Sequence, residues 1–251
     1  MPIEEKGSVI VKHGVPRLMR IEMEKMSRAF AIGRNTGLFR VPEVLGYDDL
    51  TGELTIERIH GLVGVRRALM TDSQMEAFAA RAGASLAAIH RELQLPPELR
   101  HSLPAPWSEN CATAFLHGDF STENVCVDPA DPGVPVIIDW QTTKRHGGEA
   151  TFDTSYFDVV WFISNLFYKV PFRLRAKHDC AVAASFFESY ALASRCMDHS
   201  AFHKYHRRFY VEKVRARMST MSFPMRVVFS RGQSMWDSFI RSQAGGANGL
   251  V

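Results

Sequence analysis

Two aspartates and one asparagine near the middle of the chain have the residue types and the spacing of a site for phosphate chemistry. Asp119 ends a His-Gly-Asp motif, Asn124 lies five residues further on, and an apolar run leads to Asp139. Magnesium prefers oxygen ligands, and proteins usually hold it with one or two carboxylates together with substrate phosphates. Asn124 and Asp139 could supply such ligands, while Asp119 would remain free to orient a hydroxyl group or to accept its proton.

Two short strands with a loop between them would position these side chains. Residues 125–127 alternate as in a strand directly after Asn124, the segment 129–135 is rich in turn residues, and 135–139 is typical of a second buried strand. Side chains at the ends of such strands can converge, because the strands fix the positions of the connecting loops. The sequence therefore predicts a compact unit that carries the site.

The order His-Gly-Asp, four residues, Asn, and then a strand ending in Ile-Asp-Trp resembles the aminoglycoside phosphotransferase and choline kinase family of small-molecule kinases. The resemblance implies an α+β, protein-kinase-like fold of two lobes. Residues 1–61 would form a shortened N-terminal β lobe, and residues 62–251 a mainly helical C-terminal lobe with the catalytic loop and the acceptor pocket. It also implies that ATP phosphorylates a hydroxyl group of a small molecule, with Asp119 as the catalytic residue and Asn124 and Asp139 as ligands of Mg²⁺.

Two further residues are expected to support the catalytic loop. No second His or Cys lies at metal-ligand spacing from His117, so we interpret His117 as a residue that hydrogen-bonds the loop backbone. Asp158 stands near the start of an apolar helix predicted for residues 154–168, where a carboxylate favours the helix dipole. The resemblance adds a second interpretation, which we favour, in which Asp158 accepts hydrogen bonds from the backbone of the catalytic loop.

A lysine and a glutamate near the N-terminus are predicted to form an ion pair. Lys12 ends a β-branched run at 8–12, and an amphipathic helix is expected from about 17 to 32. Glu22 falls on the apolar face of that helix, where a carboxylate is costly unless it is paired. Lys12 is the expected partner, and in the family such a pair holds the lysine against the nucleotide's α- and β-phosphates. Glu24 is a rival on another side of the helix, and both charges could instead be solvated.

The chain offers little room for a phosphate-covering loop ahead of Lys12. Family members place two strands and such a loop before this lysine, which needs roughly twenty to thirty residues. Eleven residues stand there, and Gly7 is their single glycine. We expect a fragment, a shortened form or a cap from elsewhere in the chain, with weaker nucleotide binding and a lower rate. The alternative function is a nucleotide-binding pseudokinase or regulatory module with little or no turnover.

A hairpin follows, and it leads to the expected adenine site. Residues 53–59 alternate as a strand after a turn at 48–52. The resemblance implies that backbone groups of Glu57, Arg58 and Ile59 hydrogen-bond the adenine. Because this recognition uses main-chain atoms, the sequence does not separate ATP from GTP.

The rest of the chain is predicted to be mainly helical. A helix at about 73–93 carries an apolar stripe, with Ser73 as its N-cap and Glu76 in a capping box. His90 lies on that stripe, and we interpret it as structural. Further helices are expected at 154–168, 179–197, 201–218 and 225–241, with a polar loop at 141–152 and a frayed tail at 245–249.

Composition is consistent with a cytoplasmic enzyme. A chain of 251 residues with 46% apolar content can bury one large core or two lobes. No apolar run reaches eighteen residues, and the first residues lack the pattern of a secretory signal, so we expect no membrane span. The four cysteines are scattered and are expected to be reduced thiols. The oligomeric state is not specified by the sequence.

Charge is distributed unevenly along the chain. From residue 160 onward, four Lys and ten Arg stand against five acidic residues, a net charge of +9, whereas residues 1–159 carry a net charge of −6. In the family the C-terminal helices form the acceptor pocket, so a basic set disfavours polycationic acceptors such as aminoglycosides. A neutral or anionic hydroxylated metabolite or sugar is favoured. The arginines could equally form a solvated helix face, and no nucleic-acid-binding motif accompanies them.

Overall fold

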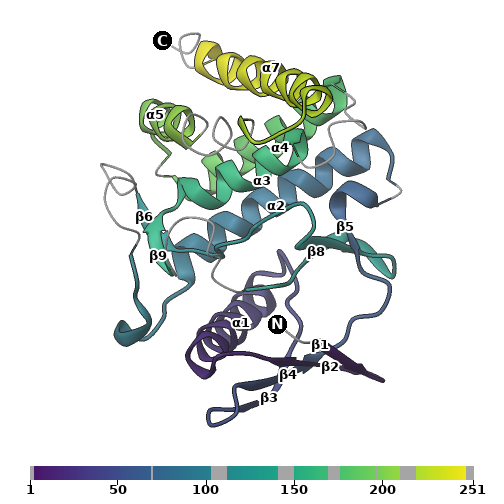
Figure 1. Cartoon of the computed structure of the whole chain (residues 1–251), viewed down its shortest axis with the longest axis vertical. Coiled ribbons are helices and arrows are strands. Elements are labelled where there is room, and N and C mark those ends of the chain that lie inside the picture. The colour runs from purple at the N-terminus through teal and green to yellow at the C-terminus, as the bar shows by residue number, and fades with distance from the viewer. Residues whose placement is uncertain are drawn as a thin grey trace.

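The N-terminal part of the chain forms an antiparallel sheet with one helix packed against it (Figure 1). The structure is a computed structural model, and it describes residues 3–68, 70–102, 112–140, 150–168, 176–195, 197–209 and 219–246. Within these residues the strands of this sheet follow the order β1-β2-β4-β3. Its elements are β1 (Ile3–Lys6), β2 (Val9–His13), α1 (Pro16–Thr36), β3 (Val44–Asp48) and β4 (Glu53–Glu57).

Short turns set the register of this sheet. Gly7 between β1 and β2 has a φ of 59°, and Gly52 between β3 and β4 has a φ of 67°, a region that favours glycine. A Cβ atom on Gly52 would lie 2.3 Å from the carbonyl oxygen of Gly14. The β3–β4 turn therefore packs directly against the chain that leads into α1, which begins at Pro16 as helices commonly do.

A second antiparallel sheet lies between the first one and the helices (Figure 1). Its strands follow the order β5-β7-β8, and they are β5 (Val63–Gly64), β7 (Val125–Asp128) and β8 (Asp131–Ile137). Arg40, which connects α1 to β3, donates its main-chain N–H to Pro135 O at 2.8 Å and accepts from Ile137 N at 2.9 Å. Main-chain hydrogen bonds therefore join the α1–β3 connection to the strand that leads to Asp139.

The remainder is mainly helical, and α2 packs along α4 (Figure 1). The helices are α2 (Asp72–Glu92), α3 (Tyr156–Tyr168), α4 (Ala176–Ser194), α5 (His199–Phe209) and α7 (Phe223–Gly246), with short 3-10 turns η1 (Val65–Arg67) and η2 (Pro97–Leu99). A strand pair, β6 (Thr113–Phe115) with β9 (Phe152–Thr154), flanks the catalytic loop. Across the described residues, no helix has both the length and the apolarity to cross a membrane.

The predicted N-cap of α2 is wrong. Thr71, not Ser73, caps the helix: its hydroxyl accepts from Gln74 N, and the Gln74 side chain accepts from Thr71 N at 2.9 Å. Ser73 with Glu76 offers the same capping-box spacing two residues later, so the pattern alone did not distinguish the two registers.

The segment 129–135 is not mainly a turn, because β8 already begins at Asp131. The three prolines of this segment suggested a turn, but β8 is an edge strand of its sheet, where a missing N–H is tolerated. Likewise, the helix predicted from residue 154 begins at Tyr156, since 152–154 form β9.

Other helix boundaries differ by a few residues. Helix α1 continues to Thr36, α4 is shifted toward the N-terminus, and α7 reaches Gly246, where a frayed tail was expected. Predictions for the loop residues 141–149, for residues 210–218 of the helix expected at 201–218, and for Cys111 and Cys196 fall outside the described residues. Cys126 and Cys180 are free thiols, as expected.

Candidate active site

The segment between β6 and β7, the predicted catalytic loop, is held by the buried carboxylate of Asp158 on α3. His117 N donates to Asp158 Oδ2 at 2.7 Å, and Gly118 N donates to Oδ1 at 2.9 Å. On α2, His90 Nε2 lies 3.1 Å from Oδ2. Burial acts to raise the pKa of Asp158, but the hydrogen bond and charge of His90 and the backbone donors hold it below its ordinary value. An ionised Asp158 therefore fixes the loop backbone.

His117 holds the loop from its buried side. Asp119 N donates to His117 Nδ1 at 3.2 Å, and His117 Nε2 lies 3.1 Å from the carbonyl oxygen of Ile138. This pattern places the ring proton on Nε2. Burial lowers the pKa of His117 to about 4, so the ring is neutral near pH 7. The neutral ring therefore connects the loop backbone to the end of β8.

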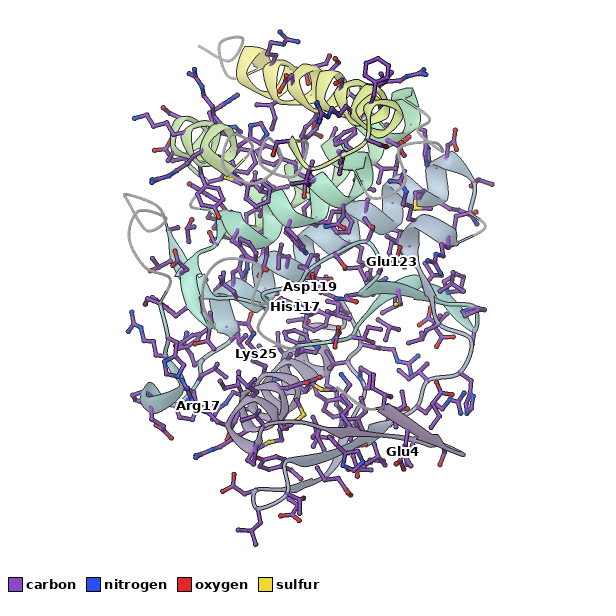
Figure 2. The ribbon with its side chains drawn as sticks, in the orientation of Figure 1. Glu4, Arg17, Lys25, His117, Asp119 and Glu123 are labelled. Carbon is purple, nitrogen blue, oxygen red and sulfur yellow. The ribbon has the colours of Figure 1, made fainter. Side chains whose placement is uncertain are left out.

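Both oxygens of the Asp119 carboxylate accept side-chain hydrogen bonds. Trp161 Nε1 on α3 donates to Oδ1 at 2.6 Å, and Asn124 Nδ2 donates to Oδ2 at 3.0 Å. Asn124 Nδ2 also lies 2.9 Å from the carbonyl oxygen of Asp119. Two donors from two elements therefore define the orientation of this carboxylate, which lies next to His117 on the loop (Figure 2).

Asn124 and Asp139 lie at the same end of one strand pair. Asn124 directly precedes β7, and Asp139 follows β8, which pairs with β7 in antiparallel fashion. Ile138 N donates to Asn124 O at 3.0 Å, which extends the pairing to the residue before Asp139. Asp139 has a φ of 63°, a left-handed conformation that Asp tolerates better than most residues. The turn at Asp139 thus ends the strand beside the catalytic loop.

Lys12 and Glu22 form a buried ion pair. Lys12 Nζ lies 2.5 Å from Glu22 Oε1 and 3.2 Å from Asp139 Oδ1. Burial acts to lower the pKa of Lys12, but the two carboxylates outweigh it and raise the pKa. The rival Glu24 instead pairs with Arg28 at 3.1 Å on the helix surface. The structure therefore brings the expected pair to Asp139, while its role toward a nucleotide stays a prediction.

The backbone groups expected to bind adenine are partly engaged elsewhere. Glu57 N donates to Glu43 O at 2.8 Å, and Arg58 N donates to Ser8 O at 2.9 Å, both within the N-terminal sheet. Ile59 follows β4, and its N–H has no backbone acceptor among the described residues. The adenine contact stays a prediction, with Ile59 the residue of the three whose N–H is available for it.

The donor set fits a magnesium ion. The amide nitrogen of Asn124 is committed to Asp119, which leaves the amide oxygen for a cation, and 40% of the Asp139 side chain is exposed. Among the residues that the structure describes, no three His, Cys, Asp or Glu side chains are grouped to hold a metal. One carboxylate and one amide oxygen suit Mg²⁺, whose remaining positions are filled by water and phosphate oxygens.

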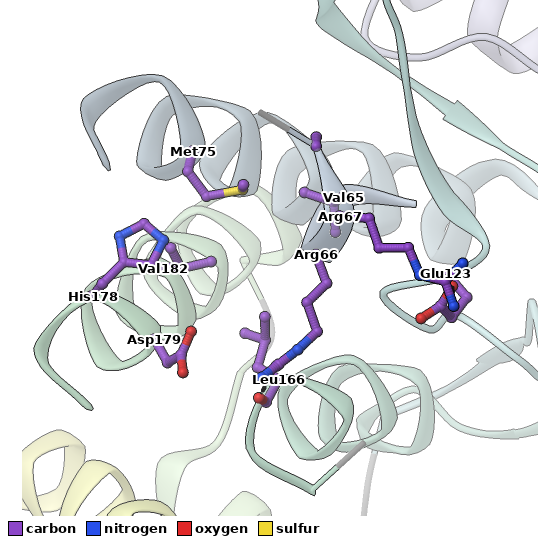
Figure 3. Close-up of a pocket in the computed structure, with 10 residues that line it drawn as sticks. Val65, Arg66, Arg67, Met75, Glu123, Leu166, His178, Asp179 and Val182 are labelled. Carbon is purple, nitrogen blue, oxygen red and sulfur yellow. Dashed lines mark hydrogen bonds and ion pairs between the residues drawn. The ribbon is translucent and has the colours of Figure 1, made fainter. Parts of the chain in front are cut away.

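A cavity of about 560 Å³ opens beside the catalytic loop (Figure 3). Glu123 of the loop faces Arg67 of η1 across 3.7 Å, and Arg66 points to the end of α3, where it donates to Leu166 O. The lining combines apolar and charged side chains from η1, α2, α3 and α4: Val65, Arg66, Arg67, Ala68, Met75, Glu123, Leu166, His178, Asp179 and Val182. The cavity therefore offers both apolar contact and hydrogen-bonding groups beside Glu123 of the catalytic loop.

Sequence reasoning missed two residues of this site. Trp161 binds Asp119, and Lys25 on α1 donates to the carbonyl oxygen of His117 at 2.8 Å. A signal for Trp161 was present, because it lies three residues after Asp158 and so shares its helix face. Lys25 likewise lies three residues after Glu22, on the apolar face of α1. A second charged residue on that face was a signal for another buried polar contact.

Known proteins are similar to this chain in sequence over one segment and in fold over most of its length. Residues 92–191, which contain the catalytic loop and Asp139, match the phosphotransferase enzyme family. No curated protein matches the sequence. Among solved structures, choline kinase LicA from Streptococcus pneumoniae is 13% identical and has a TM-score of 0.51, with 94% of this chain and 88% of that chain covered.

Two aminoglycoside phosphotransferases are similar to the same degree. The aminoglycoside-3'-phosphotransferase of type VIII is 16% identical with a TM-score of 0.50, over 79% of this chain and 83% of that one. An enzyme of the APH(2") type, solved with GDP and kanamycin, is 13% identical with a TM-score of 0.50, over 98% and 89%. These similarities confirm the α+β, protein-kinase-like fold. Together with the match of residues 92–191 to the phosphotransferase enzyme family, they show that this chain is similar to small-molecule kinases in one sequence segment and in fold.

Proposed function

We propose that the protein transfers the γ-phosphoryl group of ATP to a hydroxyl group of a small neutral or anionic molecule, with Mg²⁺ as cofactor. The observation that carries this proposal is the convergence on one strand end. Asp119 is oriented by Trp161 and Asn124, and Lys12 contacts Asp139 beside them. These are the groups that a kinase needs to orient an acceptor and to neutralise phosphates.

In the proposed reaction, the acceptor oxygen forms a bond to the γ-phosphorus as the bond from that phosphorus to the β–γ bridging oxygen breaks. Asp119 orients the hydroxyl group and takes up its proton, and ADP leaves. Lys12, held by Glu22, neutralises the phosphates that are not transferred. Mg²⁺ bound by Asn124 and Asp139 would supply further charge neutralisation at the phosphates.

The acceptor is proposed to occupy the cavity beside Glu123. Glu123, on its wall, belongs to the same loop as Asp119 and lies four residues after it. A small molecule in the cavity could therefore present a hydroxyl group to Asp119. The net charge of +9 from residue 160 onward supports a neutral or anionic acceptor over a polycation.

The catalytic role of Asp119 is tested by substitution. Asp119→Asn keeps the shape of the side chain but removes the proton acceptor, so turnover is expected to fall roughly 10²- to 10⁴-fold. Asp139→Ala should also abolish phosphoryl transfer, because it removes a metal ligand. Release of ADP or GDP would be measured over a panel of sugars, phosphorylated alcohols and aminoglycosides, with ATP and GTP as donors.

The matched control is Asp131→Asn, because Asp131 is an exposed carboxylate at the start of β8. Circular dichroism melting would establish that each variant is folded. Turnover at the wild-type level in Asp119→Asn or Asp139→Ala would refute the assigned roles.

One observation favours the second candidate function, a nucleotide-binding module with little or no turnover. The turn between β1 and β2 contains just Gly7 and Ser8, so this hairpin carries no long loop to cover phosphates. Calorimetric titration with Mg²⁺-ATP and Mg²⁺-GTP separates the candidates. Binding without transfer to any acceptor of the panel would favour the module, and transfer to one acceptor would exclude it.

A further inference from the structure

A buried lysine that the mechanism above does not use lies between α1 and the catalytic loop (Figure 2). Lys25 has no exposed surface, and its Nζ donates a hydrogen bond to His117 O at 2.8 Å. Among the described residues, this carbonyl is the one hydrogen-bond acceptor of the ammonium group. Burying a cation against a single neutral acceptor is costly.

Stability alone does not explain a lysine at this position. Burial lowers the pKa of Lys25 to about 8, although the carboxylates of Asp158 and Glu22 act to raise it. A methionine of similar length would fill the same space without a charge to desolvate. The position of Lys25 therefore points to a role in the site that the cation contacts.

The contact of Lys25 is with one defined peptide group of the catalytic loop. Lys25 binds the carbonyl of His117, and Asp158 Oδ1 accepts from the N–H of Gly118 at 2.9 Å. These two atoms belong to the same peptide unit, so its dipole lies between a cation and an anion. Gly118 has a φ of 89°, where the backbone of a glycine is free to adopt other conformations. The two charges thus fix a peptide that the glycine would otherwise allow to rotate.

The same helix face also carries the nucleotide-side ion pair. Glu22 lies three residues before Lys25, and residues at this spacing are neighbours on one side of a helix. Glu22 holds Lys12, and Lys25 holds the residue two positions before Asp119. Helix α1 is therefore connected to both parts of the site through two buried charges.

We propose that Lys25 is a positioning residue that holds the His117–Gly118 peptide in the orientation that presents Asp119 to the acceptor. The inference rests on the proposed function for the role of Asp119. The restraint on the peptide can be measured without catalysis.

The test is Lys25→Met, compared with Met26→Leu as a control of equal burial on the same helix. Loss of the restraint should lower kcat roughly 10- to 100-fold while the KM for the nucleotide changes by less than about twofold. Hydrogen exchange of the Gly118 amide, followed by NMR, should become about tenfold faster. Met26→Leu should leave both quantities unchanged.

Three results would overturn the proposal. In Lys25→Met, kcat and the exchange rate of the Gly118 amide could both stay unchanged, or a rise in the nucleotide KM could account for the whole loss of activity. The third result is a loss of kcat in Met26→Leu equal to that in Lys25→Met. Lys25→Arg keeps a cationic donor and serves as the second variant if Lys25→Met does not fold. If Lys25→Arg keeps the Gly118 amide protected from hydrogen exchange and has a kcat near the wild-type value, the role is supported. If it keeps that protection but loses kcat, the role is contradicted. A wild-type protein without turnover would refute the proposed function, while Gly118 exchange would still decide the restraint.

Discussion

Each oxygen of the Asp119 carboxylate accepts a hydrogen bond, and these bonds define the direction in which the carboxylate faces an acceptor. Trp161 on α3 and Asn124 at the end of the loop supply them. The rate contribution of Asp119 should therefore depend on its geometry, and Trp161 becomes a determinant of that geometry.

Trp161→Phe removes the indole donor but keeps an aromatic ring on α3. We expect kcat to fall about tenfold, since a hydrogen bond to a charged group is worth roughly 1.5–3 kcal/mol. The nucleotide KM should not change, because the indole donates to Asp119, whose proposed role is toward the acceptor and not toward the nucleotide. Steady-state kinetics with one acceptor of the panel would measure both.

Phe209→Leu is the control for Trp161→Phe, since the Phe209 ring packs in a T-shaped arrangement with the Trp161 ring and has no polar atom to donate to Asp119. An unchanged kcat in Trp161→Phe, or an equal loss in Phe209→Leu, would show that the indole hydrogen bond has no positioning role.

The sequence predicted the residues whose signal is local and missed those whose contacts depend on packing. Asp119 and Asn124 lie five residues apart in one motif, and Asp139 ends the next strand. Trp161 is separated from Asp119 by 42 residues, and Lys25 from His117 by 92. The spacing from Asp158 and Glu22 puts Trp161 and Lys25 on informative helix faces, but the partners that they meet over such separations are decided by how α1 and α3 pack.

At the scale of the elements, the contact between α2 and α4 depends on one glycine. A Cβ atom on Gly83 would lie 2.2 Å from the carbonyl oxygen of Phe186 and 3.0 Å from Tyr190 N. Both atoms belong to the backbone of α4, so no side chain can move aside to make room. Helix α2 also carries His90, which contacts Asp158, and therefore the close packing of these helices supports the catalytic loop.

Gly83→Ala should therefore destabilise the protein, although alanine is the better helix former. We expect the free energy of unfolding to fall by roughly 1–3 kcal/mol, the usual cost of inserting a methyl group into a packed interior. Urea titration followed by circular dichroism would measure it.

Gly133→Ala is the control for Gly83→Ala, since a Cβ there would meet nothing within 4 Å. A Gly83→Ala variant as stable as the wild type would show that the two helices can separate without cost.

Helices were easier to predict than short strands for a physical reason. Amphipathic helices such as α1 repeat their apolar pattern over several turns, whereas β5, β6 and β9 contain two or three residues each and have no period to detect. These strands form only by pairing with strands that are distant in sequence. For example, Thr113 of β6 pairs with Thr154 of β9. The proline-containing strand β8 was misread because edge position is a property of the assembled sheet.

At the scale of the whole molecule, buried histidines connect stability to pH. Burial lowers the pKa of His117 from 6.5 to about 4 and that of His206 to about 3, so the unfolded chain takes up protons at these sites first as pH falls. The stability that the neutral rings contribute is present above pH 6.5 and is lost on acidification.

The predicted boundary between lobes at residue 61 lies in the β4–β5 connection and stays a prediction.

The free energy of unfolding should therefore decrease between pH 6.5 and pH 4, by roughly 3 kcal/mol for His117 alone if its full shift is realised. Urea unfolding at pH 7, 5.5 and 4.5 would give this dependence. Equal stability at pH 7 and pH 4.5 would contradict the assignment of a neutral, buried His117.

The two main-chain hydrogen bonds at Arg40, together with its guanidinium contact to Asp128 at 2.8 Å, have a consequence for motion. They fasten the α1–β3 connection to β8 at one point, close to where the strand turns at Asp139. Sliding of the N-terminal sheet across β8 would break these bonds, whereas rocking about Arg40 would preserve them. We therefore expect product release to proceed by a hinge opening that pivots at Arg40.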